Sequence, residues 1–125
     1  MGVYMTKVVT SIFASAVRSA TTNSTTITNY TNRGGHIIID VTAVPGIDTV
    51  TPTIQGFDPI SGKFYDILVG TALVATGTVV LKVFPGIASS ANASANDFLP
   101  LSWRVVMTHS ALTNFTYSIS ANLGA

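Results

Sequence analysis

Few residues in this sequence could perform acid–base or metal chemistry. General acid–base catalysis needs two carboxylates, or a carboxylate and a histidine, that meet within hydrogen-bonding reach. The candidates are two histidines, His36 and His109, and five aspartates: Asp40, Asp48, Asp58, Asp66 and Asp97. None stands at a spacing typical of a catalytic pair or a metal site, and the sequence has no cysteine. We therefore predict no catalytic residue, no metal site and no cofactor, and we do not expect an enzyme.

The Gly62-Lys63 pair matches only the end of a phosphate-binding loop. That loop also needs an upstream glycine and a Ser or Thr that opens a helix, and neither accompanies this pair. Charged residues make up 9% of the chain and the formal net charge is +1, too little to hold a polyanion by bulk charge. No apolar run approaches the roughly 18 residues that span a bilayer. We expect neither a nucleic-acid nor a membrane partner.

Three aromatic residues, Tyr65, Trp103 and Tyr117, suggest a different chemistry, the stacking of a sugar ring. Aromatic side chains more often anchor a core or an interface, and we favour that interpretation. The two hypotheses differ in the exposure of Trp103, because a buried indole cannot stack on a sugar.

The elements that must position these residues are β-strands. The 125 residues, 47% of them apolar, fit one domain with one core. Runs of β-branched and aromatic residues with period two predict strands near residues 11–19, 37–44, 49–55, 64–69, 79–84, 101–109 and 115–121. Residues 58–62, Asp-Pro-Ile-Ser-Gly, predict a hairpin turn, because Asp58 can bond the backbone two residues on and Gly62 can adopt a positive φ.

These strands predict an all-β fold, an antiparallel β-sandwich of the jelly-roll or Ig-like kind with about seven to eight strands, or else a barrel. We interpret residues 1–20 as an N-terminal arm or first strand and residues 21–125 as the sandwich domain. Within that domain, the Thr- and Asn-rich residues 21–32 suit a solvent-facing edge strand. Residues 87–97 form the longest predicted loop, and loops of this length are commonly functional.

The sequence from about residue 36 to residue 122 also resembles a known class of protein. The resemblance lies in residues 37–44, 52–56, 58–65, 75–78, 83–86 and 99–105. In these blocks the chain is similar to small β-sandwich virion proteins of tailed bacteriophages, most of all to capsid decoration (cement) proteins. The first 35 residues take no part in it.

The resemblance implies a non-enzymatic phage structural protein that binds the outside of the capsid shell and stabilises it. The implied partners are the major capsid protein and copies of the chain itself, as a dimer or trimer, and the implied location is the capsid surface of the virion. The arm and the 87–97 loop would then reach neighbouring subunits. The candidate interaction residues are apolar residues of the arm, of the loop and of the position just after it: Val8, Ile12, Phe13, Ile87 and Phe98. The alternative is a tail- or fibre-associated sandwich that binds host-surface carbohydrate.

Overall fold

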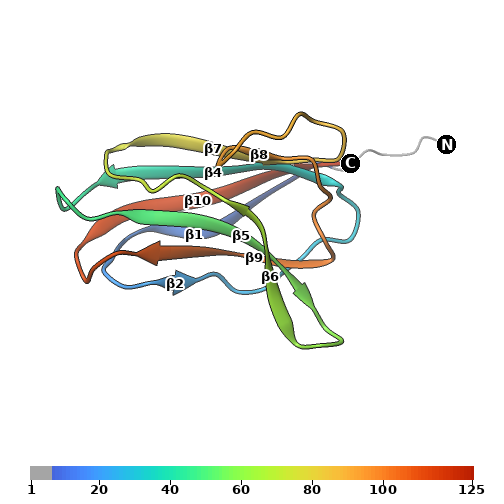
Figure 1. Cartoon of the computed structure of the whole chain (residues 1–125), viewed down its shortest axis with the longest axis horizontal. Coiled ribbons are helices and arrows are strands. Elements are labelled where there is room, and N and C mark those ends of the chain that lie inside the picture. The colour runs from blue at the N-terminus through green and yellow to red at the C-terminus, as the bar shows by residue number, and fades with distance from the viewer. Residues whose placement is uncertain (1–6) are drawn as a thin grey trace.

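The computed structural model describes residues 7–125, and this part of the chain forms ten strands and no helix (Figure 1). The strands are β1 (Val8–Arg18), β2 (Thr22–Asn23), β3 (Ile27–Thr28), β4 (Gly34–Ala43), β5 (Val50–Asp58), β6 (Lys63–Val69), β7 (Gly77–Val83), β8 (Ser94–Ala95), β9 (Ser102–His109) and β10 (Phe115–Gly124).

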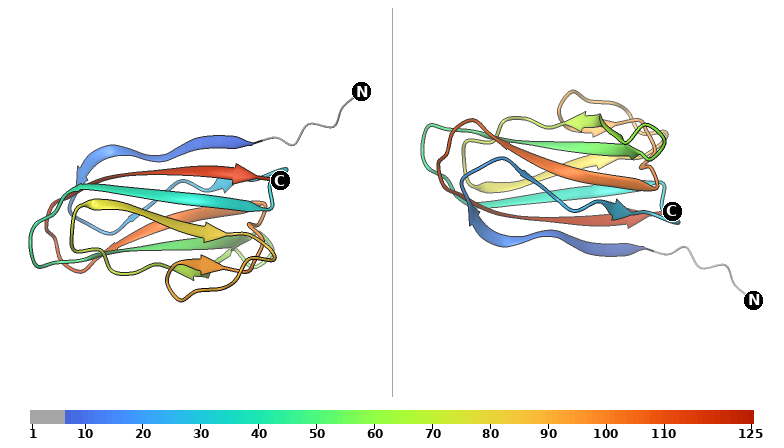
Figure 2. Two further views of the ribbon diagram at one scale, coloured as in Figure 1. Left: turned by 90° about the horizontal axis from the view of Figure 1, so that it is seen from above. Right: turned by 90° about the horizontal axis from the view of Figure 1, so that it is seen from below.

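The strands lie in two facing sheets (Figure 2). Sheet A has the order β1-β10-β4-β7-β8, and sheet B has the order β2-β9-β5-β6, with β3 also paired to β9. All neighbours are antiparallel except β7 and β8, which run parallel. The predicted antiparallel β-sandwich is therefore confirmed, and the barrel is not what the chain forms.

The core fills the space between the sheets because alternate residues of each strand point inward. On β4, Ile37, Ile39 and Val41 are buried, while the residues between them face outward. The largest fully buried side chains are Trp103 on β9 and Tyr117 and Phe115 on β10. Burial of a large apolar side chain contributes about 1.5–3 kcal/mol, so this core is the main source of stability.

The first described strand belongs to the sandwich rather than to a separate arm. β1 pairs with β10 from Val8 opposite Leu123 to Arg18 opposite Phe115, with two bulges on the way. At the bulges the backbone pairing of β1 with β10 is interrupted, and the Arg18 side chain bonds to backbone carbonyl groups there. Its Nη1 donates to the carbonyl oxygen of Tyr117 at 2.9 Å, and its Nη2 donates to the carbonyl oxygen of Ala14 at 2.8 Å. Residues 1–20 were predicted to be an arm or a first strand. Residues 8–18 form a first strand, which begins three residues earlier than the predicted start at residue 11. Residues 1–6 lie outside the described part.

Residues 21–32 lie at the edge of sheet B, as predicted, but they do not form one continuous strand. They make two two-residue pairings with β9, as β2 and β3, separated by a break. The break comes at Ser24, which is buried and whose side-chain Oγ accepts from the Val105 N–H at 2.9 Å. The strand then ends before Asn29, which is also buried and whose Nδ2 donates to the carbonyl oxygens of Asn32 and Leu99 at 2.6 and 3.0 Å. Ser24, Asn29 and Asn32 are thus buried, while most of the other polar residues of the segment face solvent as predicted.

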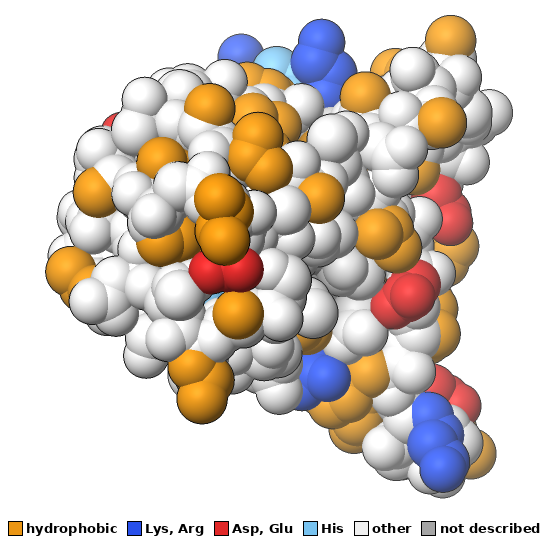
Figure 3. All heavy atoms as spheres, turned by 60° about the vertical axis from the view of Figure 1, so that its left-hand side comes forward, with side chains coloured by type: hydrophobic (Ala, Val, Ile, Leu, Met, Phe, Trp, Pro, Cys, Tyr) orange, Lys and Arg blue, Asp and Glu red, His pale blue; other side chains and the backbone are white. Residues whose placement is uncertain are grey.

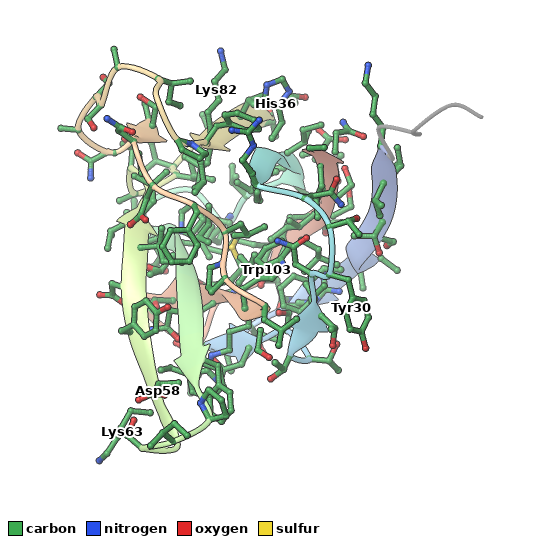
Figure 4. The ribbon with its side chains drawn as sticks, turned by 90° about the vertical axis from the view of Figure 1, so that its right-hand side faces the viewer. Tyr30, His36, Asp58, Lys63, Lys82 and Trp103 are labelled. Carbon is green, nitrogen blue, oxygen red and sulfur yellow. The ribbon has the colours of Figure 1, made fainter. Side chains whose placement is uncertain are left out.

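The predicted turn at residues 58–62 is confirmed in its chemistry. The Oδ1 atom of Asp58 accepts from the N–H of Ile60 at 3.0 Å, and Gly62 has a φ of 72°. Hydrogen bonds from Ser61 and from the Ile60 N–H hold the pKa of Asp58 below its ordinary value. The β5–β6 hairpin that this turn closes projects from the body of the sandwich, with Asp58 and Lys63 at its tip (Figure 4).

Candidate interaction surface

The titratable residues are spread over the molecule and serve local structure. The described part of the chain holds no cluster of three or more His, Asp or other ligand side chains that could bind a metal ion. Thr113 donates to Asp48 at 2.8 Å, and Gln55 donates to Asp66 at 2.9 Å. His109 is buried, and burial lowers its pKa. Residues 7–125 contain no helix of the length and hydropathy needed to cross a membrane.

The aromatic residues do not form a sugar-stacking platform. Trp103 and Tyr117 both have 0% exposure, and Figure 4 shows Trp103 in the interior between the sheets. Tyr65 is 45% exposed, and its ring lies over Gly56 on β5. The carbohydrate hypothesis that depended on Trp103 is therefore wrong, and its place in the core agrees with the interpretation we favoured.

The predicted interaction residues fall into two groups. Phe13 belongs to the buried core, and Val8 and Ile12 pack against that core. Pairing with β10 directs these side chains into their own sandwich, so they do not offer an outward surface as we expected. Ile87 is half-buried, whereas Phe98 is 59% exposed. The structure does not bring the five residues together in one surface.

Other exposed apolar side chains lie on three connecting loops at one end of the sandwich. We call this region the loop end, and it consists of residues 44–49, 70–76 and 110–114. Ile47 is 92% exposed, Leu112 is 82% exposed and Val74 is 53% exposed. Asp48 is the one charged residue in these three loops. Figure 3, with this end turned forward, shows hydrophobic side chains scattered over a face that has few charges.

Hydrogen bonds hold the three loops to one another. The Ser110 N–H donates to the carbonyl oxygen of Thr49, and the Thr49 N–H donates to Ser110 Oγ, both at 2.9 Å. The backbones of Val50 and Leu73 exchange two further bonds, of 3.1 and 2.8 Å. The side chain of Leu73 is buried and anchors the 70–76 loop to the core. The exposed residues of the loop end therefore sit on a fixed frame, which lowers the entropy cost of binding.

A shallow hollow of about 340 Å³ borders the loop end. Its lining combines apolar side chains, those of Val41, Leu73, Val74 and Val79, with the polar residues Thr76 and Thr78. A hollow beside exposed apolar side chains is an arrangement that a protein partner can fill with its own side chains.

The opposite end of the sandwich has a different character. His36 on β4 is paired with Lys82 on β7, and the two lie side by side in Figure 4. A hollow of about 420 Å³ there is lined by the basic residues Lys7 and His36 and by apolar side chains: Val8, Val9, Phe84 and Leu123. The start of β1 and the C-terminus share this end. Exposed apolar side chains occur at this end too, namely Val9, Tyr30, Phe98 and Leu101, so the two ends differ mainly in the basic residues that this one carries.

Sequence reasoning missed the loop end. The feature that could have indicated it is a large aliphatic residue within a predicted turn. Ile47 follows Pro45-Gly46, and Leu112 lies between Ser110 and Thr113. Turn residues are normally polar, so a large apolar side chain in a turn favours contact with another surface. Comparison of the chain with known protein families, curated proteins and solved structures found no match.

Proposed function

We propose that this protein is a non-enzymatic structural protein of a tailed-phage virion that binds the outside of the capsid shell through its loop end and stabilises the shell. The observation that carries the proposal is the exposure of Ile47, Leu112 and Val74 on a hydrogen-bonded frame with one charged residue. The sequence resemblance of residues 36–122 supplies the context of a phage particle. The partners proposed are the major capsid protein and further copies of this chain.

The strand order supports a jelly-roll sandwich as the finer fold class. If β2 and β3 count as one interrupted strand and β8 is set aside, eight strands remain. They pair in the orders β1-β10-β4-β7 and β2/β3-β9-β5-β6, so that the first strand lies beside the last and connections cross between sheets. Jelly rolls of this kind occur in viral capsid proteins and also in lectins.

The low charge of the surface also favours a protein that works in an assembly. A protein with charges in only 9% of its residues has a weak electrostatic barrier to close packing with a neighbour. On a symmetric shell, weak sites act together, so a modest contact at each loop end gives firm attachment of an oligomer.

The test is co-sedimentation of the purified protein with capsid shells from which it has been removed. We expect Ile47→Asp combined with Leu112→Asp to weaken binding about tenfold or more, because a charge would be buried in an apolar contact. Ile60→Asp is the matched control, since Ile60 on the hairpin tip is 93% exposed, against 92% for Ile47. Equal binding by the double variant and the control would contradict the loop-end assignment.

Quantitative mass spectrometry of purified virions tests the wider proposal. A copy number in simple proportion to the main shell protein is expected. A few copies per particle would indicate the tail- or fibre-associated role instead, and absence from the particle would refute a virion function. Deleting residues 1–20 is a poor test, since it would remove the whole of β1 and uncover β10.

A further inference from the structure

The outer face of sheet B carries a connected row of polar side chains at the base of the β5–β6 hairpin. The strand register places Arg104 on β9 opposite Gln55 on β5, and Gln55 opposite Asp66 on β6. Arg104 Nε donates to Gln55 Oε1 at 2.9 Å, and Gln55 Nε2 donates to Asp66 Oδ1 at 2.9 Å. The Gln55 amide thus has its orientation fixed from both sides and holds the guanidinium by one nitrogen.

Two phenylalanines complete the setting of Arg104. The guanidinium carbon lies 3.5 Å from the ring centroid of Phe64, and the rings of Phe64 and Phe57 are 4.7 Å apart. All three side chains are half-buried. Stacking on a ring fixes the plane of the guanidinium, and the bond to Gln55 fixes its rotation within that plane. The side chain is therefore preorganised.

This arrangement leaves the Nη donors of Arg104 free within residues 7–125. A guanidinium has five N–H donors, and the bond to Gln55 uses the one on Nε. Within residues 7–125, the Nη1 and Nη2 atoms have no acceptor, and Asp66 reaches the group only through Gln55. Two such nitrogens form a planar fork that matches the two oxygens of a carboxylate.

The other two arginines with aromatic contacts show that this state is particular to Arg104. Arg18 uses its Nη atoms on the carbonyl oxygens of Ala14 and Tyr117, so its donors are occupied. Arg33 is exposed and lies 5.7 Å from the Phe84 ring centroid, a looser contact that does not fix its plane. Arg104 alone combines a fixed guanidinium with Nη donors that have no acceptor among residues 7–125.

We propose that Arg104 is a binding site for a carboxylate, and that the carboxylate comes from an Asp or Glu side chain of a protein partner that docks against the outer face of sheet B beside the projecting hairpin. This site lies apart from the loop end and does not depend on the proposed function. The exposed edges of Phe57 and Phe64 suit the methylene groups of such a side chain. A sugar acid fits less well, since Arg104 covers the face of Phe64 on which a sugar ring would stack.

The experiment follows the side-chain nitrogens of Arg104 by NMR in protein labelled with ¹⁵N-arginine. The probe is N-acetyl-glutamate methylamide, which carries one side-chain carboxylate, and the control probe is the matching glutamine compound, both at constant ionic strength. We expect a saturable shift of the Arg104 Nη signals at a probe concentration about tenfold lower than that which affects Arg33, the factor given by one added charge-assisted hydrogen bond. The glutamine compound should leave both unchanged.

Two variants separate a binding site from a merely structural arginine. Asp66→Asn keeps an acceptor for Gln55 but removes a nearby negative charge, so the probe should bind about two- to threefold more tightly, an effect that salt should reduce. Gln55→Met removes the bond that orients Arg104, so binding should weaken severalfold. The proposal is overturned if Arg104 responds no more than Arg33, or if the glutamine compound gives the same shift. It is also overturned if glucuronate binds more tightly than the glutamate probe, which would indicate a sugar acid.

Discussion

The Nε2 atom of His109 and the hydroxyl oxygen of Tyr117 lie 3.0 Å apart inside the sandwich and join sheet B to sheet A. The imidazole also contacts the Phe115 ring edge-on, at 5.4 Å between centroids. Its Nδ1 is buried without a hydrogen-bond partner among the described residues. The ring is therefore held as a neutral group in an apolar site.

This contact makes stability depend on pH. Burial lowers the pKa of His109 from its ordinary value of 6.5; the Thr113 backbone opposes this, and the charge of Arg18 adds to it. The unfolded chain therefore takes up a proton before the folded chain does. The stability that His109 contributes is complete above pH 6.5 and is lost as the pH falls below that value, down to the lowered pKa of the folded state.

Urea denaturation at several pH values between about 7.5 and 5 measures this dependence. The free energy of unfolding should fall by at most about 1.4 kcal/mol per pH unit, the limit for one proton. In His109→Gln, which does not titrate, this part of the slope should disappear. An unchanged slope in the variant would show that another group is responsible.

Arg18 should prove important for stability although it lies on an edge strand. Its guanidinium bonds to the carbonyl oxygens of Ala14 and Tyr117 and stacks 4.8 Å from the Phe13 ring centroid and 4.9 Å from that of Tyr117. Arg18→Met removes both bonds and leaves the part-buried carbonyl group of Tyr117 without this donor, and we expect a loss of about 1–2 kcal/mol in thermal or chemical unfolding. Lys63→Met, on the exposed hairpin, is the control and should change stability by less than about 0.5 kcal/mol.

Two glycines should differ in their tolerance of a methyl group. A Cβ on Gly35 would collide with the backbone oxygen of Asn122 on β10, which cannot move without breaking the sheet. A Cβ on Gly56 would meet the ring of Tyr65, which is 45% exposed and can swing outward. We expect Gly35→Ala to cost about 3 kcal/mol or more and Gly56→Ala about 1 kcal/mol. Equal losses in calorimetry would contradict this explanation.

The single tryptophan provides a direct test of the core. Trp103 is fully buried, so its fluorescence should be emitted at short wavelength and resist quenching by iodide until the protein unfolds. Trp103→Ala should destabilise the fold by about 3–5 kcal/mol. Trp103→Phe should cost less, because it also removes the Nε1–H group, which is buried without an acceptor among residues 7–125. Strong quenching of the native protein would refute this placement.

The sequence predicted those parts of the fold that depend on local patterns. Alternation in β4 and β10 and the turn chemistry of Asp58 and Gly62 are properties of short segments, and the structure confirms them. The segment around Asn29 was predicted wrongly, since its polar side chain is buried by bonds to a loop about 70 residues away. The strand propensity of a short segment carries no information about hydrogen-bond partners that are distant in the sequence.

The candidate sites were harder to predict than the fold because they combine distant segments. The loop end brings together loops that begin at residues 44, 70 and 110, and no periodicity links them. The row of Arg104, Gln55 and Asp66 depends on the register of three strands and on a bulge between Ile54 and Gln55. A shift of one residue in either pairing would place these side chains on opposite faces.

The pairing of β1 with β10 has a consequence for how the chain is made. Val8 is paired with Leu123, so β1 has no partner until the ribosome has produced all the strands between β1 and β10, and then β10 itself. Until then the bulged edge strand and its apolar side chains remain without their sheet. Closing so long a loop is slow, and the late joining of β1 to β10 is the step at which nascent copies are most exposed to misassembly with one another.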